Sequence, residues 1–124
     1  LPALDHSGVI FGLGYGIEML RDVPWLRDKE IWYWGDLDTH GFAMLSQMRG
    51  YFPQTRSLLM DEATLLACRE LWGKEERRQR CTADLAHLTS DEQALYDKLR
   101  RNELGDAVRL EQERVPFGIV ERTR

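Results

Sequence analysis

Three short apolar runs, each followed by a stretch with helical spacing, constrain the fold of this chain more than any other feature. The runs are rich in β-branched, aromatic and leucine side chains and span Gly8–Phe11 (GVIF), Ile31–Gly35 (IWYWG) and Ser57–Met60 (SLLM). Continuous apolar runs of this length are typical of parallel strands that are buried on both faces. Strands that alternate with helices predict an α/β fold, in which a small parallel sheet is flanked by helices.

Apolar spacing and capping residues predict helices between and after these runs. Asp61 and Thr89 are good N-cap residues, and Thr89 can form a capping box with Glu92. The predicted helices span Tyr15–Arg21, Thr39 or His40 to Tyr51, Asp61 to Leu71, and Thr89 to Asn102. In the tail, Val108 and Leu110 alternate as in a strand, whereas the residues from Glu111 to Arg114 also suit a helical turn.

Composition limits the size and class of the protein. The chain has 124 residues, of which 43% are hydrophobic and 31% charged, and these values suit one domain with one core. We expect residues 1–60 to hold the strand–helix alternation and residues 61–124 to form a mainly helical extension. A net charge of -4 does not indicate a protein that wraps a polyanion, and 2 cysteines cannot make a disulfide scaffold. No apolar run is long enough to span a membrane, so we expect a cytoplasmic protein.

An acidic motif, Gly35-Asp36-Leu37-Asp38, follows the aromatic run at the end of a predicted strand, where α/β sheets bind their ligands. Residues i and i+2 of an extended segment project to the same side, so Asp36 and Asp38 can face one point. Two adjacent carboxylates raise each other's pKa unless a cation compensates them, and a hard divalent ion such as Mg²⁺ prefers carboxylate oxygens. Two interpretations therefore stay open, because Asp38 could instead only cap the next helix.

Other polar features favour structural roles when they are considered alone. His40 could contact a metal or a phosphate, but a histidine in the first turn of a helix is more often exposed or hydrogen-bonded. The glycines between Gly12 and Gly16 lack the spacing of a dinucleotide-binding loop and favour a tight turn. The charged segment Gly73–Cys81 (GKEERRQRC) is expected to be solvated, and the four tryptophans are expected to pack in or beside the core. Glu111 and Glu113 would share a face of an extended segment, although a solvated charge run is the simpler interpretation.

Five segments in order extend the pattern beyond the acidic motif: FGLGYGIEML, PWL, YWGDLDTHGFAML, RSLLMD and RLEQERV. The strand that leads into Asp-x-Asp and a glycine resembles the Toprim domain of type VI topoisomerase A subunits and the related meiotic recombination nuclease. The complete set is similar to the C-terminal domain of the JetD family, the nuclease subunit of bacterial Wadjet anti-plasmid systems. The resemblance covers the chain from about Val9 to Val115.

This resemblance implies a Toprim-like fold and a Mg²⁺-dependent (or Mn²⁺-dependent) endonuclease that cuts plasmid DNA. It implies that Asp36 and Asp38 hold the metal in catalysis, with Glu111 and Glu113 as acidic partners near the site. The expected partners are DNA, the condensin-like SMC-type complex of the Wadjet system and a second copy of the chain. A further family glutamate is expected upstream of Leu1, so the fold is expected to be incomplete at its N-terminus.

Basic side chains and His40 are the candidates for DNA contacts outside the acidic motif. Arg77, Arg78 and Arg80 form the first basic group, and Lys98, Arg100 and Arg101 form a second group for which a solvated surface is favoured.

Two alternatives to a nuclease remain open. A haloacid dehalogenase-like phosphotransferase also places Asp-x-Asp after a strand, but that family has Thr or Val two residues after the second aspartate, where this chain has His40. A non-catalytic interaction module would use the acidic loop only to cap a helix.

Overall fold

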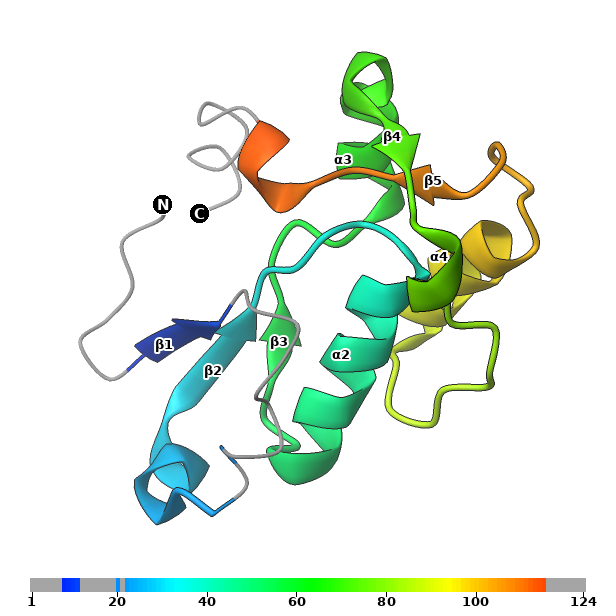
Figure 1. Ribbon diagram of the computed structural model, residues 1–124. Helices are drawn as coiled ribbons and strands as arrows, with labels where there is room; N and C mark the ends of the chain where they lie inside the picture. Colours follow the sequence, from blue (N-terminus) through cyan, green and yellow to red (C-terminus); the bar gives the residue numbers. More distant parts are fainter. Residues whose placement is uncertain (1–7, 12–19, 21, 116–124) are drawn as a thin grey trace.

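The computed structural model describes residues 8–11, 20 and 22–115, with the backbone alone for the first of these ranges. Its main sheet contains three parallel strands in the order β1 (Gly8–Phe11), β2 (Glu30–Tyr33) and β3 (Arg56–Ser57). The central strand pairs with β1 along its whole length and with β3 over two residues. The fold is therefore mixed α/β around a small parallel sheet, as predicted (Figure 1).

Three α-helices are described after the second strand: α2 (Thr39–Tyr51), α3 (Glu62–Ala67) and α4 (Ser90–Arg100). The predicted caps are confirmed, since the Asp61 side chain accepts the Thr64 N–H and both hydrogen bonds of the Thr89–Glu92 capping box are present. Single 3₁₀ turns occur at Pro24–Asp28, Arg69–Leu71, Arg77–Gln79 and Gln112–Arg114. The predicted helix over Tyr15–Arg21 and the turn at Gly12–Gly16 lie outside the described residues, apart from Leu20.

A second sheet joins two distant parts of the chain. Strand β4 (Gly73–Lys74) pairs with β5 (Val108–Arg109) in antiparallel register. One further antiparallel bridge joins Leu37, in the loop after β2, to Leu110, directly after β5. Figure 1 shows β5 and its continuation running beside the loop that leads from β2 into α2. The sequence of the tail is compatible with a strand or a helical turn, and the structure contains both in succession: β5 and then a 3₁₀ turn.

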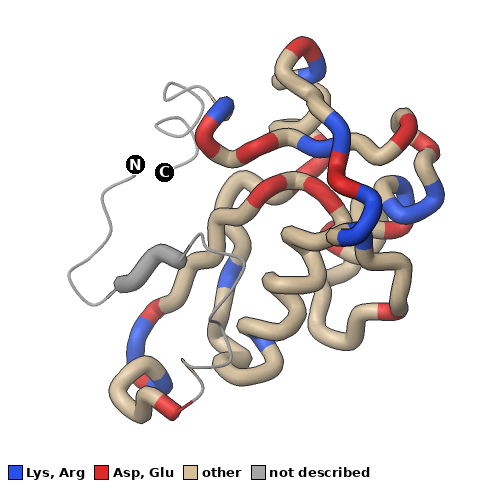
Figure 2. Tube along the Cα trace, viewed as in Figure 1, with Lys and Arg blue, Asp and Glu red and all other residues tan. Residues whose placement is uncertain are grey.

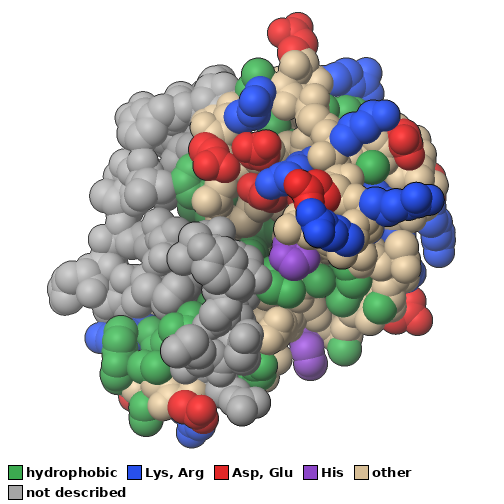
Figure 3. All heavy atoms as spheres, in the orientation of Figure 1, with side chains coloured by type: hydrophobic (Ala, Val, Ile, Leu, Met, Phe, Trp, Pro, Cys, Tyr) green, Lys and Arg blue, Asp and Glu red, His purple; other side chains and the backbone are tan. Residues whose placement is uncertain are grey.

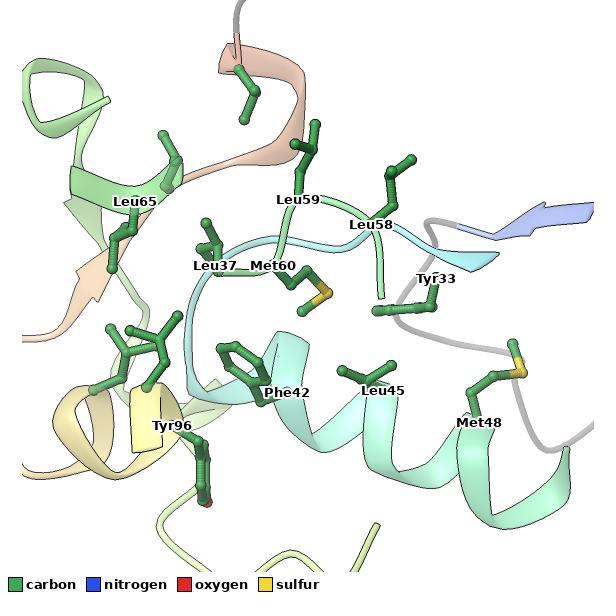
Figure 4. Close-up of a cluster of buried hydrophobic side chains, with 14 of the residues drawn as sticks. Tyr33, Leu37, Phe42, Leu45, Met48, Leu58, Leu59, Met60, Leu65 and Tyr96 are labelled. Atoms are coloured by element: carbon green, nitrogen blue, oxygen red, sulfur yellow. The ribbon is translucent and has the colours of Figure 1, made fainter. Parts of the chain in front are cut away.

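The core lies between the sheet, α2, α4 and the segment after β3 (Figure 4). Helix α2 contributes Phe42, Leu45 and Met48, and all three are fully buried. The prediction of a strand through Ser57–Met60 is wrong beyond Ser57, because Leu59 adopts a left-handed backbone conformation with φ 58°. That conformation ends strand pairing, while Leu58, Leu59 and Met60 stay buried.

The prediction that all four tryptophans pack in or beside the core is wrong for one of them. Trp32, Trp34 and Trp72 pack against the core as expected, but Trp25 is 59% exposed. It stands in a short 3₁₀ turn whose buried residue is Leu26. No described helix is long and apolar enough to cross a membrane.

A buried ion pair connects α2 to α4. Arg49 donates from Nη1 and Nη2 to the two carboxylate oxygens of Glu92, at 2.6 and 3.2 Å. The same carboxylate accepts the Ser57 hydroxyl at 2.7 Å and the Thr89 N–H at 2.9 Å. Burial raises the pKa of Glu92, but the hydrogen bonds from Arg49, Thr89 and Ser57 outweigh it and lower the pKa overall.

We predict that Glu92→Gln lowers the free energy of unfolding by about 3 kcal/mol at neutral pH, because Arg49 loses its buried counter-charge. A carboxyl whose folded-state pKa is lowered stabilises the fold above its ordinary pKa, here 4.5, and loses that effect as the pH falls through the lowered value. Urea unfolding at neutral and acidic pH should show the difference between wild type and variant shrinking in acid. The exposed Glu103→Gln is the matched control, and a similar loss in that variant would contradict the assignment.

Candidate functional site

The backbone bridge between Leu37 and Leu110 positions the acidic motif. Leu37 donates its N–H to the Leu110 carbonyl at 2.8 Å, and Leu110 donates to the Leu37 carbonyl at 3.1 Å. Both leucine side chains are buried in the core. Since side chains alternate along extended backbone, their neighbours Asp36, Asp38 and Arg109 are directed to the opposite face. The bridge therefore brings two carboxylates and one guanidinium together.

The two aspartates of the motif share Arg109 as a cation. Arg109 Nη2 lies 3.1 Å from Asp36 Oδ2, and Arg109 Nε lies 3.6 Å from Asp38 Oδ2. The other oxygen of Asp36 accepts the backbone N–H of Gln112 at 2.9 Å. The expectation that Asp36 and Asp38 face one point agrees with this geometry, in which one guanidinium reaches both carboxylates.

Asp38 also caps α2. Its Oδ1 accepts the N–H of Gly41 at 2.6 Å, and its backbone is extended as an N-cap requires. Gly41 is needed for the close approach of the loop, because a Cβ at this position would overlap the Asp36 carbonyl oxygen. The capping interpretation of Asp38 is thus confirmed. One oxygen of this carboxylate accepts a backbone N–H of α2, and the other faces Arg109.

A third acid, Glu75, lies at the same helix end and was not identified from the sequence. Its Oε1 accepts the Thr39 hydroxyl at 2.7 Å, and its Oε2 accepts the His40 N–H at 2.9 Å. The side chain is fully buried, and Arg80 Nη1 lies 3.5 Å from its carboxylate. The prediction that Gly73–Cys81 is solvated is wrong at these two positions. No local pattern marks Glu75, because its partners are the orphan N–H groups of a distant helix.

Burial and like charges make the acidic cluster electrostatically unfavourable. Desolvation raises the pKa of Asp38, the charge of Glu75 raises it further, and the hydrogen bond from Gly41 opposes them, giving a pKa of about 7. Burial opposes the charge of Arg109, but its hydrogen bond to Asp36 and the nearby carboxylates raise its pKa overall, so Arg109 stays charged. The three acids at this helix end therefore require positive charge, and Arg109 supplies it to the aspartates.

The other predicted site residues are distributed around this centre. Glu111 is half-buried and is close enough to Arg109 to contribute to its raised pKa, whereas Glu113 is exposed on the 3₁₀ turn. The His40 side chain is half-buried in the first turn of α2. Arg77 and Arg78 are exposed, but Arg80 is mostly buried and donates to the carbonyls of Leu99 and Arg100. Arg80 is thus placed as a structural residue rather than as a DNA contact.

The donor set suits a hard divalent cation, although it is not a complete shell. Asp36 and Asp38 present carboxylate oxygens, which Mg²⁺ and Mn²⁺ prefer, and a guanidinium stands where both oxygens converge. Within the described part of the chain, no group of three or more His, Cys, Asp or Glu residues is arranged to hold a metal ion. Any further ligands would come from water, from substrate or from residues outside that part.

Comparison with protein families identifies the chain. The family model described as Wadjet protein JetD, C-terminal, matches residues 1–124, which is the whole chain. The chain belongs to this family and is therefore a component of a Wadjet anti-plasmid system that acts with the other Wadjet components. A search of curated proteins found no match.

We predict that Asp38→Asn stabilises the protein by about 3 kcal/mol at about pH 8, because the variant buries no charge beside Glu75 and Asp36. Asparagine caps helices as well as aspartate does. The pKa of the Asp38 carboxyl is raised from 3.8 to about 7 in the folded protein. Its ionisation therefore lowers the free energy of unfolding as the pH rises through that interval. Thermal unfolding should therefore show the gain at about pH 8 and little difference at about pH 4.

Asp61→Asn is the matched control, because Asp61 makes the same N-cap bond at the start of α3 but is exposed. An equal, pH-independent effect in both variants would contradict the electrostatic account of Asp38.

Proposed function

We propose that this domain is the metal-dependent DNA endonuclease domain of its Wadjet system and that it cleaves the phosphodiester bonds of plasmid DNA. The observation that carries the proposal is the convergence of Asp36 and Asp38 on one cationic group at the end of the central strand. This edge is where parallel α/β sheets bind ligands. Membership of the JetD family and the resemblance of the motif to Toprim domains support the same function.

In this proposal Asp36 and Asp38 are the residues that would hold Mg²⁺ or Mn²⁺. When bound, such an ion polarises a phosphate oxygen and neutralises charge that develops during cleavage. The chain's own residues fix the ligands: Gln112 N–H orients Asp36, and Gly41 N–H orients Asp38. Glu75 fixes the first turn of α2 through Thr39 and His40, so that the site stands on a rigid helix end. Glu111 and Glu113 are proposed as acidic partners at its edge.

The proposed DNA surface lies on β4 and the turn after it. Gly73 of β4 pairs with Arg109 of β5, so the segment that carries Lys74, Arg77 and Arg78 runs beside the acidic motif. Figure 2 shows the charges alternating in sign along this part of the trace, and Figure 3 shows Lys and Arg side chains around a group of acidic ones. Exposed cations beside a metal site suit the phosphates of a DNA backbone.

Other parts of the proposal concern partners. The condensin-like SMC-type subunits of the system are proposed to deliver DNA to this domain, and a second copy of the chain is proposed to cut the opposite strand. The net charge of -4 agrees with a division in which partner subunits supply much of the grip on DNA.

The alternatives have less support. A haloacid dehalogenase-like phosphotransferase has Thr or Val two residues after the second aspartate, where this chain has His40. A non-catalytic module would explain the cap at Asp38, but membership of the JetD family favours the nuclease.

We predict that the full-length protein nicks or cuts plasmid DNA with Mg²⁺ or Mn²⁺ and that these ions raise its melting temperature. Asp36→Asn and Asp38→Asn should each abolish cutting while circular dichroism shows a folded protein, because each removes one metal ligand. Agarose electrophoresis of supercoiled plasmid measures the cutting. Asp61→Asn should cut like wild type, and undiminished cutting by both motif variants would refute the proposal.

We also predict that Arg77→Gln and Arg78→Gln each weaken DNA binding similarly for unrelated sequences. Each variant should reduce the slope of log K against log salt concentration by about 0.9, because one phosphate contact is lost. Fluorescence anisotropy with a labelled duplex measures both effects. Arg27→Gln is the control, since Arg27 lies in the turn before β2, away from the motif (Figure 1). Equal effects of all three substitutions would contradict a localised DNA surface.

A further inference from the structure

We propose that Arg109 is the internal counter-ion of the Asp36–Asp38 pair and that a divalent metal ion binds there by displacing its guanidinium. The inference rests on the proposed function and concerns how the site is kept folded and closed without metal. Arg109 is thereby a positioning residue that controls metal entry and not a residue that contacts the reacting phosphate.

Arg109 holds this position alone. Among the described residues, no other Lys or Arg forms an ion pair with Asp36 or Asp38. Arg80 contacts the third acid of the cluster, Glu75, and the carbonyls of a helix. Within the described part of the chain, replacing Arg109 by a neutral residue would therefore leave both aspartates without an ion-pair partner.

Arg109 makes few hydrogen bonds to the two aspartates, so its guanidinium can be displaced from them. Nη2 makes one hydrogen bond to Asp36 at 3.1 Å, whereas Nε is buried without a hydrogen-bond partner and lies 3.6 Å from Asp38. A separation of 3.6 Å attracts charges but is too long for a hydrogen bond. The side chain as a whole keeps 26% of its surface exposed. Its hold on the pair is thus mainly electrostatic.

Metal and guanidinium compete for the same two oxygens. The Oδ2 atoms of Asp36 and Asp38 face Arg109, while the Oδ1 atoms accept backbone N–H groups of Gln112 and Gly41. A metal ion on the Oδ2 atoms would meet the positive charge of Arg109 at close range, and arginine cannot lose its proton to relieve the repulsion. The guanidinium must therefore move to solvent as the metal enters.

This competition predicts opposite effects on two measurable quantities. Arg109→Gln should lower the melting temperature of the metal-free protein, because the acids lose their cation. It should also tighten Mn²⁺ binding by about tenfold, because no guanidinium has to be displaced. If Arg109 had only a structural role, Arg109→Gln would bind Mn²⁺ more weakly than wild type, because the loop that carries the aspartates would be disordered. Isothermal titration calorimetry of the full-length protein with MnCl₂, without DNA, measures the affinity.

Arg109→Lys and Arg100→Gln complete the experiment. The lysine keeps the charge but cannot bridge both carboxylates, so its Mn²⁺ affinity should lie between those of wild type and Arg109→Gln, and it remains informative if the glutamine variant fails to fold. Arg100 pairs with Asp84 and Asp97 away from the motif, and Arg100→Gln should bind Mn²⁺ like wild type. Unchanged or weaker Mn²⁺ binding by folded Arg109 variants would overturn the inference alone, whereas no Mn²⁺ binding by wild type would overturn the proposed function as well.

Discussion

The antiparallel bridge between Leu37 and Leu110 is the constraint on which the candidate site depends. Two backbone hydrogen bonds join the loop after the central strand to a segment near the end of the described chain. The buried leucines fix which face the neighbouring side chains occupy, and this places Arg109 opposite Asp36 and Asp38. A long-range backbone contact thus converts a local sequence motif into a cluster of charges with defined geometry.

That cluster is electrostatically costly for the fold. Asp36, Asp38 and Glu75 concentrate negative charge at the N-terminus of α2, where the helix dipole and the orphan N–H groups favour it only in part. Burial and mutual repulsion leave Asp38 with a pKa near 7, so the site gains from a cation. An internal arginine and an external metal are two solutions to the same electrostatic problem.

Local signals in the sequence were sufficient where the structure is local. Helix α2, its Asp38 cap and the Thr89–Glu92 capping box follow from neighbouring residues, and strand β1 has the predicted bounds. Leu59 departs from the predicted strand because its backbone is left-handed, and no local signal in the sequence marks that conformation. The roles of Glu75 and Arg109 depend on partners far along the chain, and a charged segment looks the same from its sequence whether or not such partners bury it.

The most direct test of a cation site at Asp36 and Asp38 is the number of protons released when Mn²⁺ binds. Calorimetry in buffers of different ionisation enthalpy gives this number at each pH. Because burial raises the pKa of Asp38 to about 7, the account predicts that Mn²⁺ binding releases more protons at about pH 6 than at about pH 8.5. Binding without proton release at the lower pH, or no binding at either pH, would contradict it.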